Sequence, residues 1–278
     1  YDLAESTGPA LRLADLADPA ELAGLSLGYG TSRGDAELRA LIAADAGVDE
    51  GDVLVTVGAV EAMFLLAQDR CRPGDRVLLI GPCFPPARSV PEGLGARVDV
   101  VTLRFADGYR LDLDAVTRAL DGRTRLVSLA SPQNPSGVRL DEAELRGLLA
   151  AVEAYAPQAV VLVDETYRDA TYGGAPVPES AAVLSPRVVT CSSLSKAHGA
   201  PGLRLGWLTT TDPELYERLR IAKFVSTIAC SAPDEYLATR LLRRRAEILA
   251  PRAARLGAAL AELEDWVRDQ PVDLVRPD

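Results

Sequence analysis

Short apolar runs rich in β-branched residues alternate along the chain with longer stretches of helical character. The runs predict seven strands, at residues 53–57, 76–80, 97–103, 125–130, 160–163, 188–191 and 205–209. The stretches between them predict helices at 35–46, 60–70, 112–120, 141–154 and 213–224. Continuous apolar strands separated by helices are typical of a mostly parallel sheet that is covered on both faces. The pattern therefore predicts one doubly wound α/β domain around a seven-stranded sheet.

The pattern changes at about residue 231, where a long helix is predicted that includes the arginine-rich stretch 239–263. We expect this helix to lead from the large domain into a second domain. The chain is therefore divided into an N-terminal arm with the start of the large domain (1–30), the rest of the large domain (31–235), and an interdomain helix with the start of an incomplete C-terminal small domain (236–278). Because the sequence begins at Tyr1 and stops where a second domain should begin, we expect material to be missing at one or both ends.

Composition narrows the classes of function. The net charge of −10 argues against a nucleic-acid or membrane-surface partner, since both require a basic face. No apolar run approaches the roughly 18 residues that cross a bilayer, and no secretion signal follows Tyr1. Four widely spaced cysteines and a single histidine, His198, supply neither a metal site nor a Ser-His-Asp hydrolase. We therefore expect no metal, and buried thiols in a reducing cytoplasm.

Distinctive polar and small residues follow the ends of several predicted strands. In an open α/β sheet, ligands bind at the carboxyl ends of the strands. A common placement at these ends predicts one shared site, formed by residues 58–59, 83–85, 131–137, 164–167 and 192–196.

The segment 192–207 carries the strongest chemical signal. It reads Ser-Ser-Leu-Ser-Lys-Ala-His-Gly-Ala-Pro-Gly-Leu-Arg-Leu-Gly-Trp. The Lys196 amine can form an imine with a carbonyl, and Ser193, Ser195 and Arg204 can hold a phosphate through charge-assisted hydrogen bonds. An isolated Ser-x-Ser-Lys is more often a polar loop with a solvated lysine. The Gly-Leu-Arg-Leu-Gly-Trp continuation favours a phosphate-bearing aldehyde instead.

This segment resembles the Schiff-base lysine motif of class I/II aminotransferases, which have the pyridoxal-phosphate fold-type I architecture. The resemblance runs in the family's order from about Asp2 to about Trp207, and more loosely to the end of the chain. It implies that Lys196 carries pyridoxal 5'-phosphate as a Schiff base and takes the substrate's Cα proton as general base. It also implies that residues 31–235 are the cofactor-binding large domain.

Two further motifs imply partners for the pyridine ring. Residues 131–137 (Ser-Pro-Gln-Asn-Pro-Ser-Gly) resemble the family's Asn-Pro-x-Asn-Pro-Thr-Gly turn, which implies that Asn134 donates to the phenolic oxygen of the ring. Ser131 departs from that pattern. Residues 163–167 (Val-Asp-Glu-Thr-Tyr) resemble the Asp-Glu-x-Tyr strand end. The resemblance implies that Asp164 keeps the ring nitrogen protonated and that Tyr167 also donates to the phenolic oxygen. Taken alone, residues 131–137 would also suit a loop with fixed dihedral angles, and Asp164 would also suit the cap of the next helix.

Two more motifs imply a binding site for the cofactor phosphate and an aromatic side chain that stacks on the pyridine ring. Residues 56–62 resemble the strand–turn–helix at which the family seats the phosphate, with Ala59 and Val60 contributing amide groups. The family often has Ser or Thr where Val60 stands, so no side-chain donor is expected there. Residues 82–85 resemble Pro-x-Tyr-Pro, which implies that Phe84 stacks on the ring without hydrogen bonding. An isolated phenylalanine would otherwise be a core residue.

Upstream segments imply a second subunit. Residues 28–39 resemble a segment whose tyrosine, here Tyr29, reaches the phosphate of the neighbouring subunit, so a homodimer with composite sites is implied. Residues 2–8 resemble the arm that closes over the substrate. Nothing in residues 240–278 resembles the motif of the small-domain arginine that binds the substrate carboxylate. We attribute this to the missing part of the small domain.

The sequence thus predicts an aminotransferase that moves an amino group between an L-amino acid and a 2-keto acid. The alternative keeps the cofactor and performs elimination, replacement, cyclisation or oxidation, because fold does not fix the reaction. A non-enzymatic regulatory domain is less favoured, since residues 1–46 show no basic helix-turn-helix. A nucleotide-binding Rossmann enzyme is excluded, because no strand precedes a Gly-x-Gly-x-x-Gly.

Overall fold

The computed structural model describes residues 6 and 8–278, and its centre is a seven-stranded sheet. The strand order is β1-β7-β6-β5-β4-β2-β3. Four pairings are parallel, and β7 is antiparallel to both of its neighbours. The prediction of a mostly parallel sheet with seven strands is confirmed. The strands are β1 (Val53–Thr56), β2 (Arg76–Gly81), β3 (Arg97–Thr102), β4 (Thr124–Ala130), β5 (Val160–Asp164), β6 (Val188–Ser193) and β7 (Gly206–Thr210).

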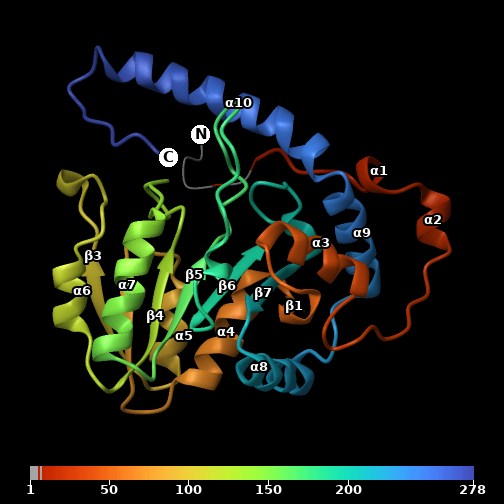
Figure 1. Ribbon diagram of the computed structural model, residues 1–278. Coiled ribbons are helices and arrows are strands. Elements are labelled where there is room, and N and C mark those ends of the chain that lie inside the picture. The colour runs from red at the N-terminus through yellow and green to blue at the C-terminus, as the bar shows by residue number, and fades with distance from the viewer. Residues whose placement is uncertain (1–5, 7) are drawn as a thin grey trace.

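Helices cover both faces of this sheet, as continuous apolar strands require (Figure 1). One face packs against α4 (Gly58–Arg70), α5 (Pro86–Gly93) and α8 (Pro213–Ser226). The other face packs against α6 (Leu113–Ala119) and α7 (Glu142–Tyr155). Beyond the β1 edge, α3 (Ala36–Ala46) and α9 (Ala232–Arg243) pack on each other and enclose a third apolar cluster. The predicted doubly wound α/β architecture is therefore confirmed.

Aspartates fix the starts of three predicted helices. Asp35, Asp112 and Asp141 were each predicted as the first helical residue, and each is instead the N-cap. Their carboxylates accept hydrogen bonds from amides in the first turn, which would otherwise lack partners. At α7, Glu144 also accepts from the Asp141 amide and completes a capping box.

The continuous helix predicted after residue 231 is wrong in one respect, because it is broken at Arg244. α9 ends at Arg243, Arg244 has φ −104° and ψ 18°, and α10 then runs over Arg245–Val267. Arg245 forms ion pairs with Asp45 and Asp169 of the large domain, which fix the corner between the two helices. The short helices α1 (Leu13–Leu16) and α2 (Pro19–Ala23) and the proline-containing α5 were not predicted.

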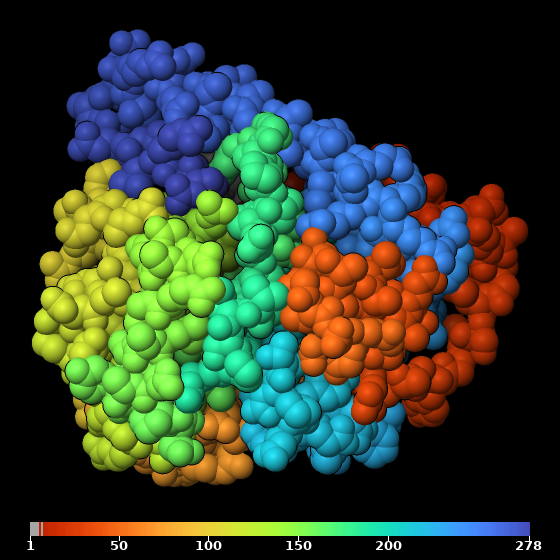
Figure 2. Space-filling view, in the orientation of Figure 1, coloured from red at the N-terminus to blue at the C-terminus, as the bar shows by residue number. Residues whose placement is uncertain are grey.

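α10 runs across the top of the molecule, above the strands (Figure 1). The loop that follows β5 rises to meet it, and the two are in contact in the space-filling view (Figure 2). There the Gly173 amide donates to the Ala253 carbonyl at 2.8 Å. A Cβ on Gly257 would lie 2.8 Å from the Gly173 nitrogen, so only a glycine allows this approach. Within residues 6 and 8–278, no helix combines the length and apolar character needed to span a bilayer.

Candidate active site

A cavity of about 750 Å³ opens at the carboxyl ends of the central strands. The predicted site residues line it with one exception, Tyr29, which is 88% exposed and lies elsewhere on the surface. The chain therefore brings together, from separate strand ends, Ala59, Val60, Phe84, Asn134, Asp164, Tyr167, Ser193, Ser195, Lys196 and Arg204.

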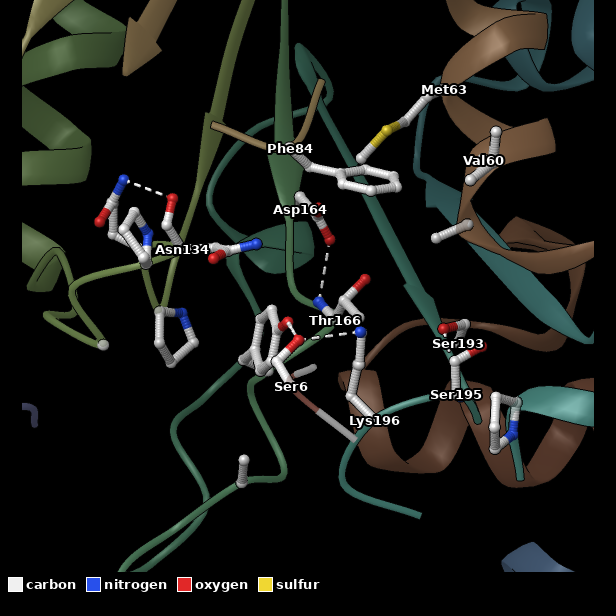
Figure 3. A pocket seen from close by; sticks show the side chains of 18 of the residues that line it. Ser6, Val60, Met63, Phe84, Asn134, Asp164, Thr166, Ser193, Ser195 and Lys196 are labelled. Carbon is white, nitrogen blue, oxygen red and sulfur yellow. Dashed lines mark hydrogen bonds between the residues drawn. The ribbon is translucent and has the colours of Figure 1, made fainter. Parts of the chain in front are cut away.

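One end of the cavity suits an anion. α4 begins at Gly58 with φ +73°, and among the described residues no N-cap side chain accepts from its first amides. A Cβ at Gly58 would lie 2.8 Å from the Arg204 guanidinium, so the glycine makes room for that group. Within the described chain Arg204 forms no ion pair with a carboxylate. Ser193 and Ser195 lie side by side at this end (Figure 3). Free amides, hydroxyls and an unpaired guanidinium are the donors that phosphate requires.

The middle of the cavity suits a cationic ring. The Asp164 carboxylate ends β5 and accepts from the Thr166 amide at 3.0 Å. Burial raises the pKa of Asp164, and no described lysine, arginine or histidine lies within 4 Å of it. Such a carboxylate calls for a cationic partner from outside the chain. Phe84, Met63 and Asp164 face the same space (Figure 3).

The lysine lies opposite, in contact with the arm. Lys196 Nζ donates to Ser6 Oγ at 2.9 Å, and Ser6 Oγ lies 2.7 Å from the Tyr167 hydroxyl. Nζ also lies 5.9 Å from the centre of the Tyr167 ring. The resemblance placed an arm here, and Ser6, which belongs to the described part of that arm, contacts the lysine. The other arm residues named above, at positions 2–5 and 7, lie outside the described residues.

Sequence reasoning missed the lining residues Met63 and Tyr172, and it gave Gln133 no role of its own within the predicted 131–137 turn. Met63 lies one helical turn beyond Val60, so helical spacing from the phosphate seat could have found it. Gln133 occupies the variable position of the 131–137 turn. Its buried amide donates to the Asn134 carbonyl at 2.8 Å and accepts from the Ser136 amide at 2.9 Å, which holds the turn around Asn134. No pattern in the sequence points to Tyr172.

His198, two residues after the lysine, belongs to the support of the site. It is 1% exposed, and burial lowers its pKa to about 4 despite Asp169, whose carboxylate lies 3.4 Å from Nε2. Asp169 also pairs with Arg245 of α10. His198 is therefore neutral at pH 7 and packs, buried, beside the Asp169–Arg245 ion pair. Within residues 6 and 8–278, no three histidine, cysteine or acidic side chains converge as metal ligands.

Comparison with known proteins fits this arrangement. Residues 1–268 match the sequence family described as aminotransferase class I and II. The chain belongs to this family. Its cofactor is pyridoxal 5'-phosphate, and the groups just described fit it: the donors at the anion end for the phosphate, the half-buried Asp164 carboxylate for the pyridine nitrogen, and a lysine amine for the aldehyde.

Individual relatives and structures extend the comparison. The chain is 34% identical to capreomycidine synthase of Streptomyces vinaceus over 88% of its own length and 62% of the relative. It is 33% identical to arginine–pyruvate transaminase of Pseudomonas aeruginosa over 65% of its length and 47% of the relative. A pyridoxal-phosphate-dependent aminotransferase from Streptococcus suis superimposes with a TM-score of 0.89 at 26% identity, covering all of this chain and 75% of that one. The chain thus spans less than two thirds of the length of both curated relatives.

Proposed function

We propose that the whole protein is an aminotransferase that moves an amino group between an L-amino acid and a 2-keto acid. The observation that carries the proposal is Asp164, a half-buried carboxylate with no cation beside it among the described residues, in one cavity with a lysine amine and a set of anion-binding donors. A carboxylate that keeps the ring nitrogen protonated would let the bound cofactor act as an electron sink for the substrate's Cα electrons. That property suits amino-group transfer.

Lys196 has two tasks in this proposal. Its amine would hold the cofactor aldehyde and, when a substrate amine has freed it, would move a proton at the substrate Cα. The Lys196 Nζ atom lies at the cavity surface, 2.9 Å from Ser6 Oγ, where a substrate can reach it. The amine serves as base in one direction, and its protonated form serves as acid in the other.

The remaining side chains hold and orient the cofactor. Asn134 and Tyr167 would donate to its phenolic oxygen, and Phe84 would cover one ring face without hydrogen bonding. Val60 and Ala59 supply amides of the α4 first turn to the phosphate. Hydroxyls and a guanidinium complete the phosphate seat, from Ser193, Ser195 and Arg204.

We further propose a homodimer in which Tyr29 reaches the partner's cofactor phosphate. Tyr29 is 88% exposed and takes no part in the cavity of its own chain. The adjacent helices α4 and α8 expose Phe64, Ile221, Phe224 and Val225, an apolar surface that a second copy would cover. A reducing cytoplasmic location is part of this proposal, because all four cysteines are free thiols.

The test is an assay of the full-length protein with single amino acids, with and without a keto-acid acceptor. Without an acceptor, a transaminase releases one equivalent of keto acid per site and stops. With an acceptor it turns over continuously. Continuous formation of product from one amino acid alone would contradict amino-group transfer.

That contrary result would support the second candidate, in which the same site performs elimination, replacement or cyclisation. The 34% identity to capreomycidine synthase favours this candidate, because that relative is named as a synthase and not as a transaminase. Both candidates use Lys196 and Asp164 in the same way up to removal of the Cα proton. The acceptor dependence therefore separates them.

A further inference from the structure

The N-terminal arm is fastened to the lysine segment on both sides of position 7. On one side, Ser6 Oγ lies 2.9 Å from Lys196 Nζ and 2.7 Å from the Tyr167 hydroxyl. On the other side, the Leu11 amide donates to the Gly199 carbonyl at 2.8 Å. The arm therefore crosses the turn in which the Gly199 amide donates back to the Lys196 carbonyl at 3.0 Å.

Arg252 of α10 forms the third fastening. Its Nη2 donates to the Pro9 carbonyl at 2.6 Å, and its Nη1 lies 3.0 Å from the position of a Cβ on Gly8. The guanidinium also fills the space beside Gly199, which has φ +69° and where any Cβ would collide with it. Within the described chain Arg252 forms no ion pair with a carboxylate. Because the described partner of the Arg252 guanidinium is a backbone carbonyl of the arm and not a carboxylate, we assign this arginine the task of holding the arm.

A serine hydroxyl suits the contact with the lysine. It can accept a hydrogen bond from an ammonium group and donate one to a neutral amine, so it can hold Nζ in either protonation state. The Tyr167 hydroxyl can accept from Ser6 Oγ when the serine accepts from the lysine, and can donate to it when the serine donates to the lysine. A lysine restrained in this way spends less of its time in unproductive rotamers.

We propose that Ser6 and Arg252 are positioning residues, which hold the N-terminal arm across the Lys196–Gly199 turn and thereby fix the Lys196 amine in the cavity. The arm, and α10 through Arg252, thus control how freely that amine moves. The inference deepens the proposed function, because it rests on the role given there to Lys196. That function assigns no task to the arm's side chains or to α10.

The chain offers an internal standard for the test, because its only lysines are Lys196 and Lys223. Lys223 is fully buried and donates to the Ser32 carbonyl at 2.8 Å. The full-length protein is stripped of cofactor and treated with formaldehyde and cyanoborohydride. Peptide mass spectrometry then gives the methylation rate of each lysine. This readout needs neither bound cofactor nor activity.

Loss of one hydrogen bond predicts that Ser6→Ala raises the methylation rate of Lys196 about threefold to tenfold. Ser6→Thr keeps the hydroxyl and should stay near the wild-type rate. Arg252→Ala should also raise the methylation rate of Lys196. The Ser6→Ala/Arg252→Ala double variant should show less than the product of the two single increases, because both substitutions release the same arm. Arg255→Ala is the matched control on α10, since Arg255 is exposed and has no side-chain partner among the described residues.

The proposal is overturned if Ser6→Ala leaves the Lys196 rate unchanged, or if Ser6→Thr behaves like Ser6→Ala. An equal rise at Lys223 would overturn it as well, because the protection of Lys196 would then reflect the fold as a whole. A negative result in this methylation test would leave the proposed function intact. A protein that binds no cofactor at Lys196 would fail that function without changing these rates.

Discussion

Gly206 on β7 and Ala59 on α4 approach each other so closely that no side chain fits between them. A Cβ at Gly206 would lie 2.6 Å from the Ala59 amide nitrogen and 2.5 Å from the Gly58 carbonyl carbon. These are backbone atoms of the turn that presents its amides to the anion end of the cavity. The glycine therefore sets the position of that turn against the sheet.

Gly206→Ala should force β7 and α4 apart and destabilise the protein by about 1–3 kcal/mol, the usual cost of overpacking. Because the displaced atoms include the Ala59 amide, affinity for pyridoxal 5'-phosphate should also fall. Denaturant unfolding and cofactor titration measure the two effects. Gly202→Ala is the control, since a Cβ there meets nothing within 4 Å. Equal behaviour of the two variants would refute the close-approach argument.

Asp164→Asn should stabilise the cofactor-free protein but lower the activity of the cofactor-loaded enzyme. Burial raises the pKa of Asp164 above its unfolded value, so its ionisation costs stability as pH rises through that raised pKa. The asparagine removes this cost, and the cofactor-free variant should melt higher than wild type at pH 7. With cofactor the ring nitrogen loses its charged partner, and kcat should fall at least about a hundredfold. A lower melting temperature without cofactor would contradict the unpaired state of this carboxylate.

The sheet and most of the cavity could be predicted because their signals are local. Seven apolar runs define seven strands, and ligand-binding residues collect where such strands end. Ser6, Tyr172 and Arg252 could not be predicted in detail. Each reaches its place through contacts between segments distant in sequence, such as Ser6 with Lys196. The break at Arg244 depends in the same way on the ion pairs of Arg245 with Asp45 and Asp169.

His198 should make stability depend on pH below neutrality. Its pKa is about 4 in the folded protein and near 6.5 when unfolded, so the unfolded state binds more protons between these values. Stability should therefore fall as pH drops from 6.5 to 4, by up to about 3 kcal/mol from this group. His198→Phe removes the titration. The difference in unfolding free energy between wild type and variant, measured from pH 7 to 4, should shrink toward acid. A constant difference would show that His198 does not titrate with folding.

Tyr29 offers a test of the composite site by complementation. Subunits with Lys196→Ala lack the cofactor-binding lysine, and subunits with Tyr29→Ala cannot supply the tyrosine to the site of the partner. In a mixed dimer, one of the two sites combines an intact Lys196 with an intact Tyr29 from the other chain. Mixing should therefore raise activity above that of either variant alone. No gain on mixing, with mixed dimers demonstrated by differential tagging, would contradict the contribution of Tyr29 across subunits.

The central claim is that Lys196 carries the cofactor, and borohydride reduction of the full-length protein with pyridoxal 5'-phosphate tests it most directly. Reduction fixes the bond, and peptide mass spectrometry locates it. The account predicts a phosphopyridoxyl group on Lys196 and none on Lys223, and loss of the visible cofactor band in Lys196→Ala. Label on Lys223, or a band retained in Lys196→Ala, would contradict it.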